Sequence, residues 1–536
     1  TLILSNRNKS IELRPIRGNA VTPQTVRHPG ISATLVYAGR GELRDLNGKQ
    51  VDNSILLMEL DSGKNWLHAA NLGAQAVVYI DRGESPKQFF KEKLELSPLQ
   101  FPRFWMSLAE AEKAFGNFEK APNGLVEAEA QLFSQINWQM AISENIYCFV
   151  EGTDPELKER LIMVEAFYDS TAAVAGLSPG ADEAVSIATL LELARYLKEN
   201  PPQRTVLLIA SSGHAQALAG MREMIWSICA RSKDMRKLKK TFKALVKKTR
   251  KTIKLLKSVS FDSANTRGPA DEETTRLLKE AIDERLKTES DRVSRSLMHL
   301  RLENRDKANT EKIEKLAAER LLLKRLMFSS DYTDLSAEDR RVLTQLIPKA
   351  IEDQSAILSD ARRHAREIDD ARSFRSQVKA YDLDAAVSLH LSSHGDGFGA
   401  FNYGWMFPFR PRINRTAIYS KLDQVLRQGA EQIVDALGHS GMYKDSLRPS
   451  RRRSWQSYFL DQPPLGGELT ALAGVHGLTF VTTHDARARW GTPYDKPEYV
   501  DAAFALKQSA VVCRLIEHVA RTPRLHDDIF PRFGYS

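Results

Sequence analysis

The feature that most constrains the fold is a long segment, residues 231–378, that almost lacks the two residues that interrupt helices. It contains one glycine, Gly268, and two prolines, Pro269 and Pro348. Apolar side chains recur there at spacings of three and four residues between charged ones, which is the pattern of amphipathic helices. Because the apolar positions form only a narrow stripe, the segment predicts long helices that pack on one another like a coiled coil.

The sequence on both sides of this segment alternates between short apolar strands and helices. Before it, strands are predicted at 31–37, 55–60, 77–80, 146–150, 161–167 and 205–210, and a helix at 182–200. After it, strands are predicted at 387–391 and 478–482, and helices at 415–438 and 500–521. The same alternation therefore resumes after the helical segment, which predicts an insertion within one α/β domain that contains a mixed sheet. We divide the chain into a β-rich domain (1–140), an α/β domain (141–230 and 379–536) and a helical insertion (231–378).

The net charge of +9 is concentrated in one part of the chain. Residues 231–260 contain 13 Lys or Arg against one Asp, which is +12, so subtracting 12 from 9 leaves −3 for all other residues. Such a cluster is typical of a surface that meets an acidic protein, an anionic membrane or phosphate, although it can also be a solvated helix face. We expect a protein partner at the insertion, with an anionic membrane as the alternative. Nucleic acid is disfavoured because the cluster holds one aromatic residue, Phe242, and no nucleic-acid motif. The candidate binding residues are Lys243, Lys247, Lys248 and Lys251.

The composition excludes several classes of protein. Three cysteines, Cys148, Cys229 and Cys513, are too few for a disulfide scaffold or a Cys-rich zinc module. No apolar run reaches the roughly 18 residues that a membrane-spanning helix needs. The chain opens with TLILSNRNKS, which has neither an initiator Met nor an apolar leader. We therefore expect a processed form or a part of a larger protein.

Several blocks of sequence resemble known families. The block LVYAGRGELRDLNGKQVDNSILLMELDSGKNWLHAANLGAQAVVYI (35–80) resembles a protease-associated domain, which would make residues 1–140 protease-associated-like. Three further blocks are NIYCFVEGTDPELKERLIMVEAFYDS (145–170), PGADEAVSIATLLELARYL (179–197) and RTVLLIASSGHAQALAG (204–220). These blocks resemble the zinc-dependent aminopeptidase family, which also includes glutamate carboxypeptidase and the non-catalytic transferrin receptor and nicastrin. The resemblance covers about 35–226 and 380–520, and it implies a mixed-sheet zinc-aminopeptidase-like domain.

The metal-site positions that this resemblance implies are mostly changed. Active members hold two metal ions that share a bridging Asp, with a Glu as general base. Of the five metal ligands, only the bridging one is kept, as Asp182. The other positions read Phe167 for a His, His390 for an Asp, Gly491 for a His, and, in the Glu-Glu block, His214 with Ala215 or, after a shift of one residue, Gly213 with His214.

Two functions remain open from these residues. One carboxylate cannot hold two divalent ions, because each ion needs about three protein ligands. The first interpretation is therefore a peptidase fold that has lost its di-zinc site, needs no cofactor and acts as a binding or scaffold module. The alternative is a metallopeptidase-like hydrolase with a rebuilt site for one zinc or other divalent metal. Its ligands would be Asp182, His214 and His390, with His214 also the candidate catalytic residue and Asp169 orienting the site.

The resemblance also implies a location. Family members are often secreted or anchored by a neighbouring membrane segment. We therefore expect this chain outside the cytoplasm, in the periplasm or the extracellular space, where it would be a free protein or the soluble part of a membrane protein.

Overall fold

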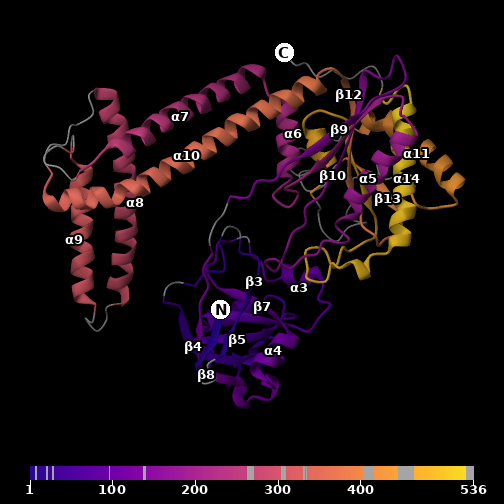
Figure 1. Cartoon of the computed structure of the whole chain (residues 1–536). Coiled ribbons are helices and arrows are strands. Elements are labelled where there is room, and N and C mark those ends of the chain that lie inside the picture. Colours follow the sequence, from indigo (N-terminus) through magenta and orange to yellow (C-terminus); the bar gives the residue numbers. More distant parts are fainter. Residues whose placement is uncertain are drawn as a thin grey trace. The chain divides into compact units, whose positions relative to one another are not determined.

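The structure is a computed structural model whose helices and strands fall into two compact units (Figure 1). One unit, here named the α/β unit, comprises Thr1–Trp226 and Val378–Ser536, and the other, the helical unit, comprises Ser227–Gln377. The structure describes all residues except 6–8, 20–21, 27–28, 96, 137–139, 262–270, 304–308, 330–331, 333–334, 403–415, 445–463 and 527–536. Among the helices it describes, none combines the length and the apolar character that crossing a bilayer requires.

The first 132 residues of the α/β unit form an eight-stranded sheet with the order β2-β1-β8-β4-β5-β6-β7-β3. Its strands are β1 (Leu2–Leu4), β2 (Lys9–Ile11), β3 (Arg14–Pro15), β4 (Ile31–Tyr37), β5 (Ser54–Glu59), β6 (Ala76–Asp81), β7 (Arg103–Ser107) and β8 (Leu125–Leu132). Strands β4 to β7 pair in parallel and the other neighbours are antiparallel. The three strands predicted in this part are confirmed to within one residue.

Both faces of this sheet are buried, which explains the nearly continuous apolar sequences of β5 and β6. Alternate residues of β5 point to opposite faces: Ile55 and Leu57 belong to one apolar cluster, and Leu56 and Met58 to the other. The helices of this part are α1 (Leu43–Leu46), α2 (Trp66–Asn71), α3 (Lys87–Lys91) and α4 (Leu108–Phe115). The assignment of this part as a protease-associated domain stays a prediction.

A six-stranded mixed sheet forms the rest of the α/β unit, in the order β13-β14-β12-β10-β11-β9. Its strands are β9 (Ile146–Val150), β10 (Arg160–Phe167), β11 (Thr205–Ser211), β12 (Asp382–His390), β13 (Phe398–Phe401) and β14 (Gly477–Thr482). The four central strands are parallel, and β9 and β13 run antiparallel at the edges. Strands β10 and β12 are neighbours although the helical unit lies between them in the sequence. The predicted mixed-sheet α/β fold class is confirmed.

Helices cover both faces of the six-stranded sheet. Helices α5 (Val185–Glu199), α11 (Thr416–Leu437) and α14 (Ala502–Arg521) share one apolar cluster with alternate residues of the central strands, such as Ile162 and Val164. Helix α13 (Gly466–Leu472) packs against β12 and β14 on the opposite face of the sheet. Its first residue, Gly466, lies against the side chain of Glu165. Helix α6 (Ala219–Cys229) follows β11 in the chain. The helices predicted at 182–200, 415–438 and 500–521 are confirmed.

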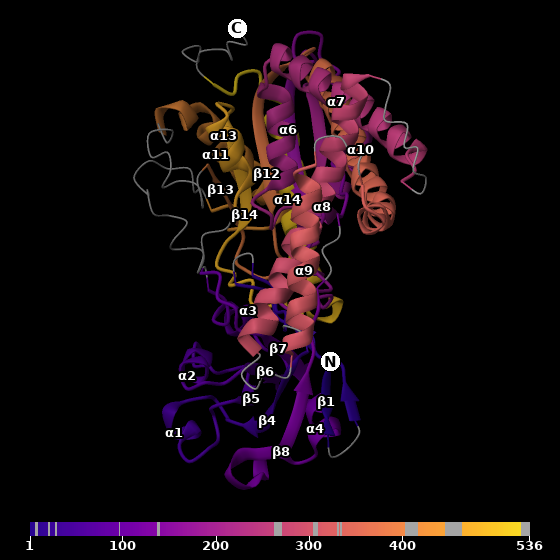
Figure 2. The same ribbon diagram turned by 90° about the vertical axis from the view of Figure 1, so that its left-hand side faces the viewer.

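The helical unit contains four long helices within the part that the structure describes. They are α7 (Ser232–Ser258), α8 (Glu272–Glu303), α9 (Thr310–Met327) and α10 (Ala337–Val378, whose last residue lies beyond the unit boundary). Helices α8 and α9 lie side by side in both views (Figures 1 and 2). Their narrow apolar faces pack on one another and on α7 and α10, in a cluster that contains Leu256, Leu286, Leu323 and Leu343. The predicted long helices are confirmed, whereas a coiled-coil geometry stays a prediction.

Candidate functional site

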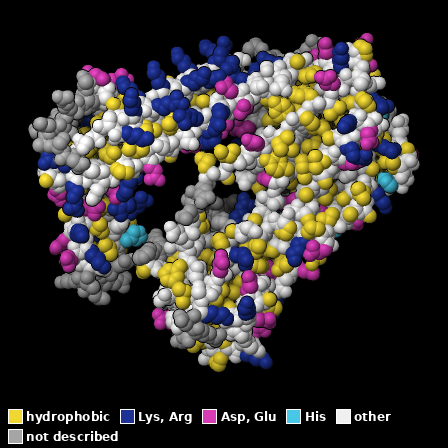
Figure 3. All heavy atoms as spheres, viewed as in Figure 1, with side chains coloured by type: hydrophobic (Ala, Val, Ile, Leu, Met, Phe, Trp, Pro, Cys, Tyr) yellow, Lys and Arg dark blue, Asp and Glu magenta, His cyan; other side chains and the backbone are white. Residues whose placement is uncertain are grey.

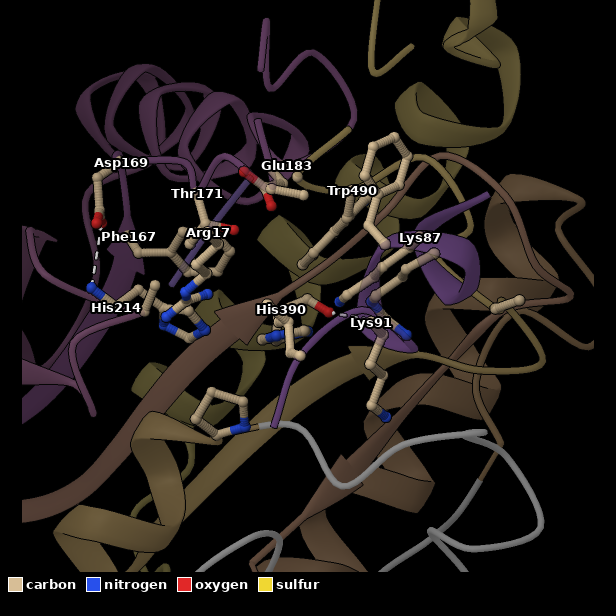
Figure 4. Close-up of a pocket in the computed structure, with 18 of the residues that line it drawn as sticks. Arg17, Lys87, Lys91, Phe167, Asp169, Thr171, Glu183, His214, His390 and Trp490 are labelled. Carbon is tan, nitrogen blue, oxygen red and sulfur yellow. Dashed lines mark hydrogen bonds between the residues drawn. The ribbon is translucent and has the colours of Figure 1, made fainter. Parts of the chain in front are cut away.

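A cavity of about 530 Å³ lies at the carboxyl ends of three parallel strands of the six-stranded sheet (Figure 4). Phe167 ends β10, His390 ends β12, and His214 follows the end of β11 by three residues. The segment 485–491 adds further lining residues from beyond β14. The carboxyl ends of parallel strands meet at one edge, and α/β proteins commonly bind ligands at that edge. The fold therefore brings these separated residues to a typical ligand-binding position.

Aromatic and imidazole rings form one wall of this cavity. The Phe167 and His214 rings stack with centroids 4.0 Å apart and planes at 22°. The ring of His390 lies 5.4 Å from that of His214 and 5.1 Å from that of Trp490 (Figure 4). Phe167, which stands where the family resemblance implies a metal-binding His, thus packs its ring directly on one of the two candidate ligands.

Both histidines of the wall are neutral at physiological pH. Desolvation, with the charge of Lys87 as the next cause, lowers the pKa of His214 to about 3. Desolvation also holds the pKa of His390 well below its ordinary value, with the Arg487 guanidinium as the next cause. The Nδ1 atom of His390 is buried without a hydrogen-bond partner among the described residues. The two rings are therefore in the neutral state in which imidazole binds metals. A neutral imidazole can equally form hydrogen bonds with an uncharged ligand.

The carboxylate of Asp182 is held by two protein donors. Its Oδ1 accepts a hydrogen bond of 2.6 Å from the backbone N–H of Ser393, and its Oδ2 accepts one of 2.6 Å from the indole Nε1–H of Trp490. The backbone N–H of Asp182 donates in turn to Asp495 Oδ1 at 2.8 Å. The Asp182 side chain is buried. Each of its oxygens thus has a short, charge-assisted bond from within the protein.

We expect the Trp490→Phe variant to lower the free energy of unfolding of the α/β unit by about 1–3 kcal/mol, because the buried Asp182 carboxylate loses one of its donors. The readout is the midpoint of urea unfolding, followed by tryptophan fluorescence. The matched control is Trp226→Phe, which also removes one indole but from an exposed position. Equal midpoints for the two variants would contradict the importance of this hydrogen bond.

Acidic and basic groups that sequence reasoning did not single out also line the cavity. Burial raises the pKa of Glu183 to about 8, with repulsion from Asp495 as the next cause, and its Oε2 has no partner among the described residues. The buried Arg487 donates to the backbone oxygens of His390 and Thr482, each at 3.1 Å. The only sequence signal for Glu183 is its position beside Asp182, and no local pattern marks Arg487.

Three lining cations come from the N-terminal part of the α/β unit. Arg17 follows β3, and Lys87 and Lys91 are the first and last residues of α3 (Figure 4). The backbone N–H of Lys87 also bonds to the Ala488 oxygen at 2.6 Å, in the segment that carries Trp490. The eight-stranded part of the unit thus contributes positive charge to a cavity whose wall belongs to the six-stranded sheet.

The structure brings some of the candidate metal ligands together and not others. His214 and His390 are neighbours, and Trp490 contacts both His390 and Asp182. The Asp169 carboxylate accepts a bond of 3.3 Å from the backbone N–H of His214 and lines the same cavity. Among the residues whose positions are described, no three or more His, Cys, Asp or Glu side chains are grouped so that they could hold a metal ion. In this arrangement the described residues do not form a ready-made centre for two metal ions.

The four candidate binding lysines lie on α7, in the helical unit. Lys248 and Lys251 form ion pairs with Glu280 and Glu273 of α8, at 2.8 and 3.0 Å. Lys243 and Lys247 are exposed. Of the four lysines predicted as binding residues, two therefore have acidic partners within the protein and two are exposed to solvent.

A family match supports the peptidase resemblance over part of the chain. Residues 145–296 match the sequence model of peptidase family M28. No curated protein matches the chain. Among solved structures, a zinc aminopeptidase from Bacillus subtilis, BSAP, aligns at 13% identity with a TM-score of 0.42, over 98% of this chain and 82% of BSAP. An aminopeptidase from Aneurinibacillus sp. strain AM-1 aligns at 12% identity with a TM-score of 0.35, over 99% of this chain and 85% of that one.

The family match differs in extent from the predicted resemblance. It begins one residue before β9 and runs through β10 and β11 into α7 and α8, whereas β12, which carries His390, lies outside it. The resemblance predicted at 380–520 lies outside the match and stays a prediction. Over residues 145–296 this chain is similar to peptidase family M28, which confirms that it resembles the zinc aminopeptidases.

Proposed function

We propose that this aminopeptidase-like fold has lost the di-zinc peptidase site and acts as a binding or scaffold module outside the cytoplasm. The observation that carries the proposal is the environment of Asp182. Its two oxygens are engaged by Ser393 and Trp490, so binding a metal would require exchanging strong protein hydrogen bonds for metal coordination. A residue that stands where a bridging ligand is expected is thus used as a structural hydrogen-bond acceptor.

The surrounding positions support the same proposal. Phe167 offers no lone pair where the resemblance implies a His ligand, and its ring stacks on His214. Gly491 stands where another His is implied and has no side chain at all. A dinuclear site needs about three protein ligands for each ion, in addition to a base that activates water. Among the described residues of the cavity, no such set of metal ligands is grouped in one place.

The cavity supports a role in binding. A volume of about 530 Å³ is within the range of small-molecule sites, and it combines apolar rings with a few polar groups. Phe90, Leu94, Phe167 and Trp490 supply apolar surface, while Arg17 and Lys91 supply positive charge. Asp169, Glu183 and Asp485 also line the cavity, so the lining suits a small organic ligand that has an apolar part and polar groups. The location outside the cytoplasm rests only on the family resemblance.

A metallopeptidase-like hydrolase with one metal is the second candidate function. It is supported by the neutral rings of His214 and His390, which lie 5.4 Å apart, and by the unpartnered Nδ1 of His390. Two imidazoles and one carboxylate suit zinc or another divalent ion, which would supply a Lewis acid at the cavity wall. In this alternative Asp182 would have to leave Ser393 and Trp490 and turn toward the two rings.

We expect protein purified without chelator and then incubated with zinc to retain far less than one equivalent of metal, and to hydrolyse amino-acid arylamides no faster than buffer does. Metal analysis by mass spectrometry and a chromogenic assay measure the two quantities. The control is the His214→Ala/His390→Ala variant, which should behave as the unmodified chain does.

Two outcomes would contradict the proposed loss of the metal site. Stoichiometric metal that disappears in the double variant would establish the single-metal alternative, because three ligands are the minimum for retention. Turnover that chelator and Asp182→Asn both abolish would show that the fold has kept metal-dependent chemistry.

A further inference from the structure

Six exposed cations form a continuous line along α7. They recur every three or four residues, the spacing that places side chains on one face of a helix. These residues, here named the basic stripe, are Arg236, Lys240, Lys243, Lys247, Arg250 and Lys254. From the first to the last the stripe is about 27 Å long, at about 1.5 Å per residue. Figure 3 shows Lys and Arg side chains gathered over this helix.

Packing within the helical unit fixes the direction in which the stripe points. The opposite side of α7 carries the buried residues Met235, Thr249, Thr252 and Leu256. Leu256 belongs to the main apolar cluster of the helical unit, and Met235 packs in a second cluster with residues of α10. The helix therefore cannot rotate to bury its cations without exposing its apolar side. The stripe is held toward solvent by the core of its own unit.

The acidic residues that contact α7 leave the stripe unneutralised. Three ion pairs join α7 to the rest of the helical unit, and they use Lys239, Lys248 and Lys251, none of which belongs to the stripe. Their partners are Asp369, Glu280 and Glu273. No stripe residue forms an ion pair with any residue that the structure describes. The three acidic residues that contact α7 therefore pair with lysines next to the basic stripe and leave the stripe residues without an ion pair within the described structure.

This arrangement is electrostatically unfavourable for the isolated protein. Like charges three and four residues apart repel along the whole stripe. None of the ion pairs in the described part of the helical unit involves a stripe residue, so none of them neutralises a stripe charge directly. A negatively charged surface outside the chain would offset this repulsion.

We propose that the basic stripe docks on an anionic lipid bilayer. Four of the six stripe residues are lysines, and lysine is depleted in protein–protein interfaces. Such interfaces derive most of their binding energy from a few buried side chains, mainly Trp, Tyr and Arg. Helix α7 has no Asn, Gln, Trp or Tyr to read or stack on bases, and its one aromatic residue, Phe242, stacks on His364. A straight row of lysines without apolar anchors suits diffuse attraction to a flat layer of anionic headgroups.

The test is binding of the full chain to vesicles of phosphatidylcholine, with and without about one third phosphatidylglycerol. We expect binding only to the anionic vesicles, followed by co-sedimentation. Binding should be lost when salt is raised from about 0.1 M to about 1 M, because the screening length falls from about 10 Å to about 3 Å. The stripe variant K240Q/K243Q/K247Q/K254Q should bind roughly 600-fold more weakly, since each lysine near such a surface strengthens binding about fivefold.

The matched control removes the same charge elsewhere in the helical unit. The variant K287Q/K312Q/K315Q/K324Q changes four exposed helical lysines outside α7, and it should bind anionic vesicles as the unmodified chain does. Equal weakening of the two variants would show a net-charge effect and overturn the proposal. Failure to bind anionic vesicles at low salt would also overturn it, as would stripe-dependent capture of duplex DNA or of an acidic protein without vesicle binding. Circular dichroism of both variants checks that the helices remain.

Discussion

Replacing Arg204 by alanine is expected to lower the free energy of unfolding of the α/β unit by about 3 kcal/mol, because the buried Asp384 carboxylate keeps only Arg160 of its two arginine partners and the backbone oxygens at the end of α14 lose their donor. The side chains of Arg204 and Asp384 are 0% and 3% exposed, and Arg204 Nε lies 2.8 Å from Asp384 Oδ2. The Arg204 guanidinium also donates to backbone oxygens of Val519, Thr522 and Pro523, at the end of α14. One side chain therefore joins β12 to the carboxyl-terminal end of α14, where a cation is favourable.

The experiment can follow the α/β unit by itself. All seven tryptophans of the chain fall within the residue ranges of that unit, so tryptophan fluorescence in urea reports its unfolding midpoint. The control is Arg195→Ala, which removes an arginine whose pairs with Glu192 and Glu199 are exposed, and which should leave the midpoint almost unchanged.

A second variant keeps this prediction testable if Arg204→Ala does not fold. Arg204→Lys keeps the charge but not the planar fork that reaches Asp384 and the end of α14 at once, so we expect an intermediate loss. A loss for Arg204→Ala no larger than that for Arg195→Ala would contradict the role assigned to the buried pair.

The parts of the fold that could be predicted from the sequence have local signals. The run TVLLIA is short, apolar and rich in branched residues, and it forms β11, a strand that lies between two neighbours in the sheet. The helix predicted at 182–200 follows from apolar residues at helical spacing, and α5 spans Val185–Glu199. Periods of two and of about 3.6 residues are visible in any window of the chain, so these elements needed no knowledge of the tertiary structure.

The candidate site could be predicted only in part, because its decisive contacts are not local. The family resemblance placed His214 and His390 in one candidate metal site, and their rings do lie 5.4 Å apart. The bond from Trp490 to Asp182 joins residues 308 positions apart, and no sequence pattern announces it. The family resemblance identified Gly491 as the position of a missing metal ligand. The neighbouring residue, Trp490, is the one that donates a hydrogen bond to Asp182. The cations that line the cavity come from the eight-stranded part of the unit, which sequence reasoning treated as separate.

For Glu165 the sequence pattern predicts the strand in which it lies, but it does not predict the raised pKa of its carboxyl group. It lies in the middle of LIMVEAF, in β10, where its side chain is buried between two serines. Ser211 donates a hydrogen bond to its carboxyl group, and Ser388 forms another. Helix α13 begins directly over this group: a Cβ added to Gly466 would lie 2.9 Å from Glu165 Oε2. Desolvation in this enclosed place raises the pKa of Glu165 from its ordinary 4.5 to about 7.

This raised pKa predicts a specific dependence of stability on pH. Between about pH 4.5 and pH 7 the unfolded chain loses the Glu165 proton while the folded chain keeps it, so the contribution of this group to stability falls as the pH rises. Above the folded pKa the full cost of a buried charge is present, about 3 kcal/mol for a shift of about 2.5 units. Below the unfolded pKa there is no such cost, because the group is neutral in both states.

Glu165→Gln should therefore stabilise the α/β unit at about pH 8 by up to about 3 kcal/mol and have little effect at about pH 4.5. The amide keeps the shape of the neutral acid and can still bond to the two serines. The measurement is the urea midpoint by tryptophan fluorescence across this pH range, with Glu156→Gln, an exposed change of the same kind, as the control. Destabilisation by Glu165→Gln at high pH would contradict this prediction. It would mean that the folded protein stabilises the ionised carboxylate through a partner other than the two serines, such as a bound cation.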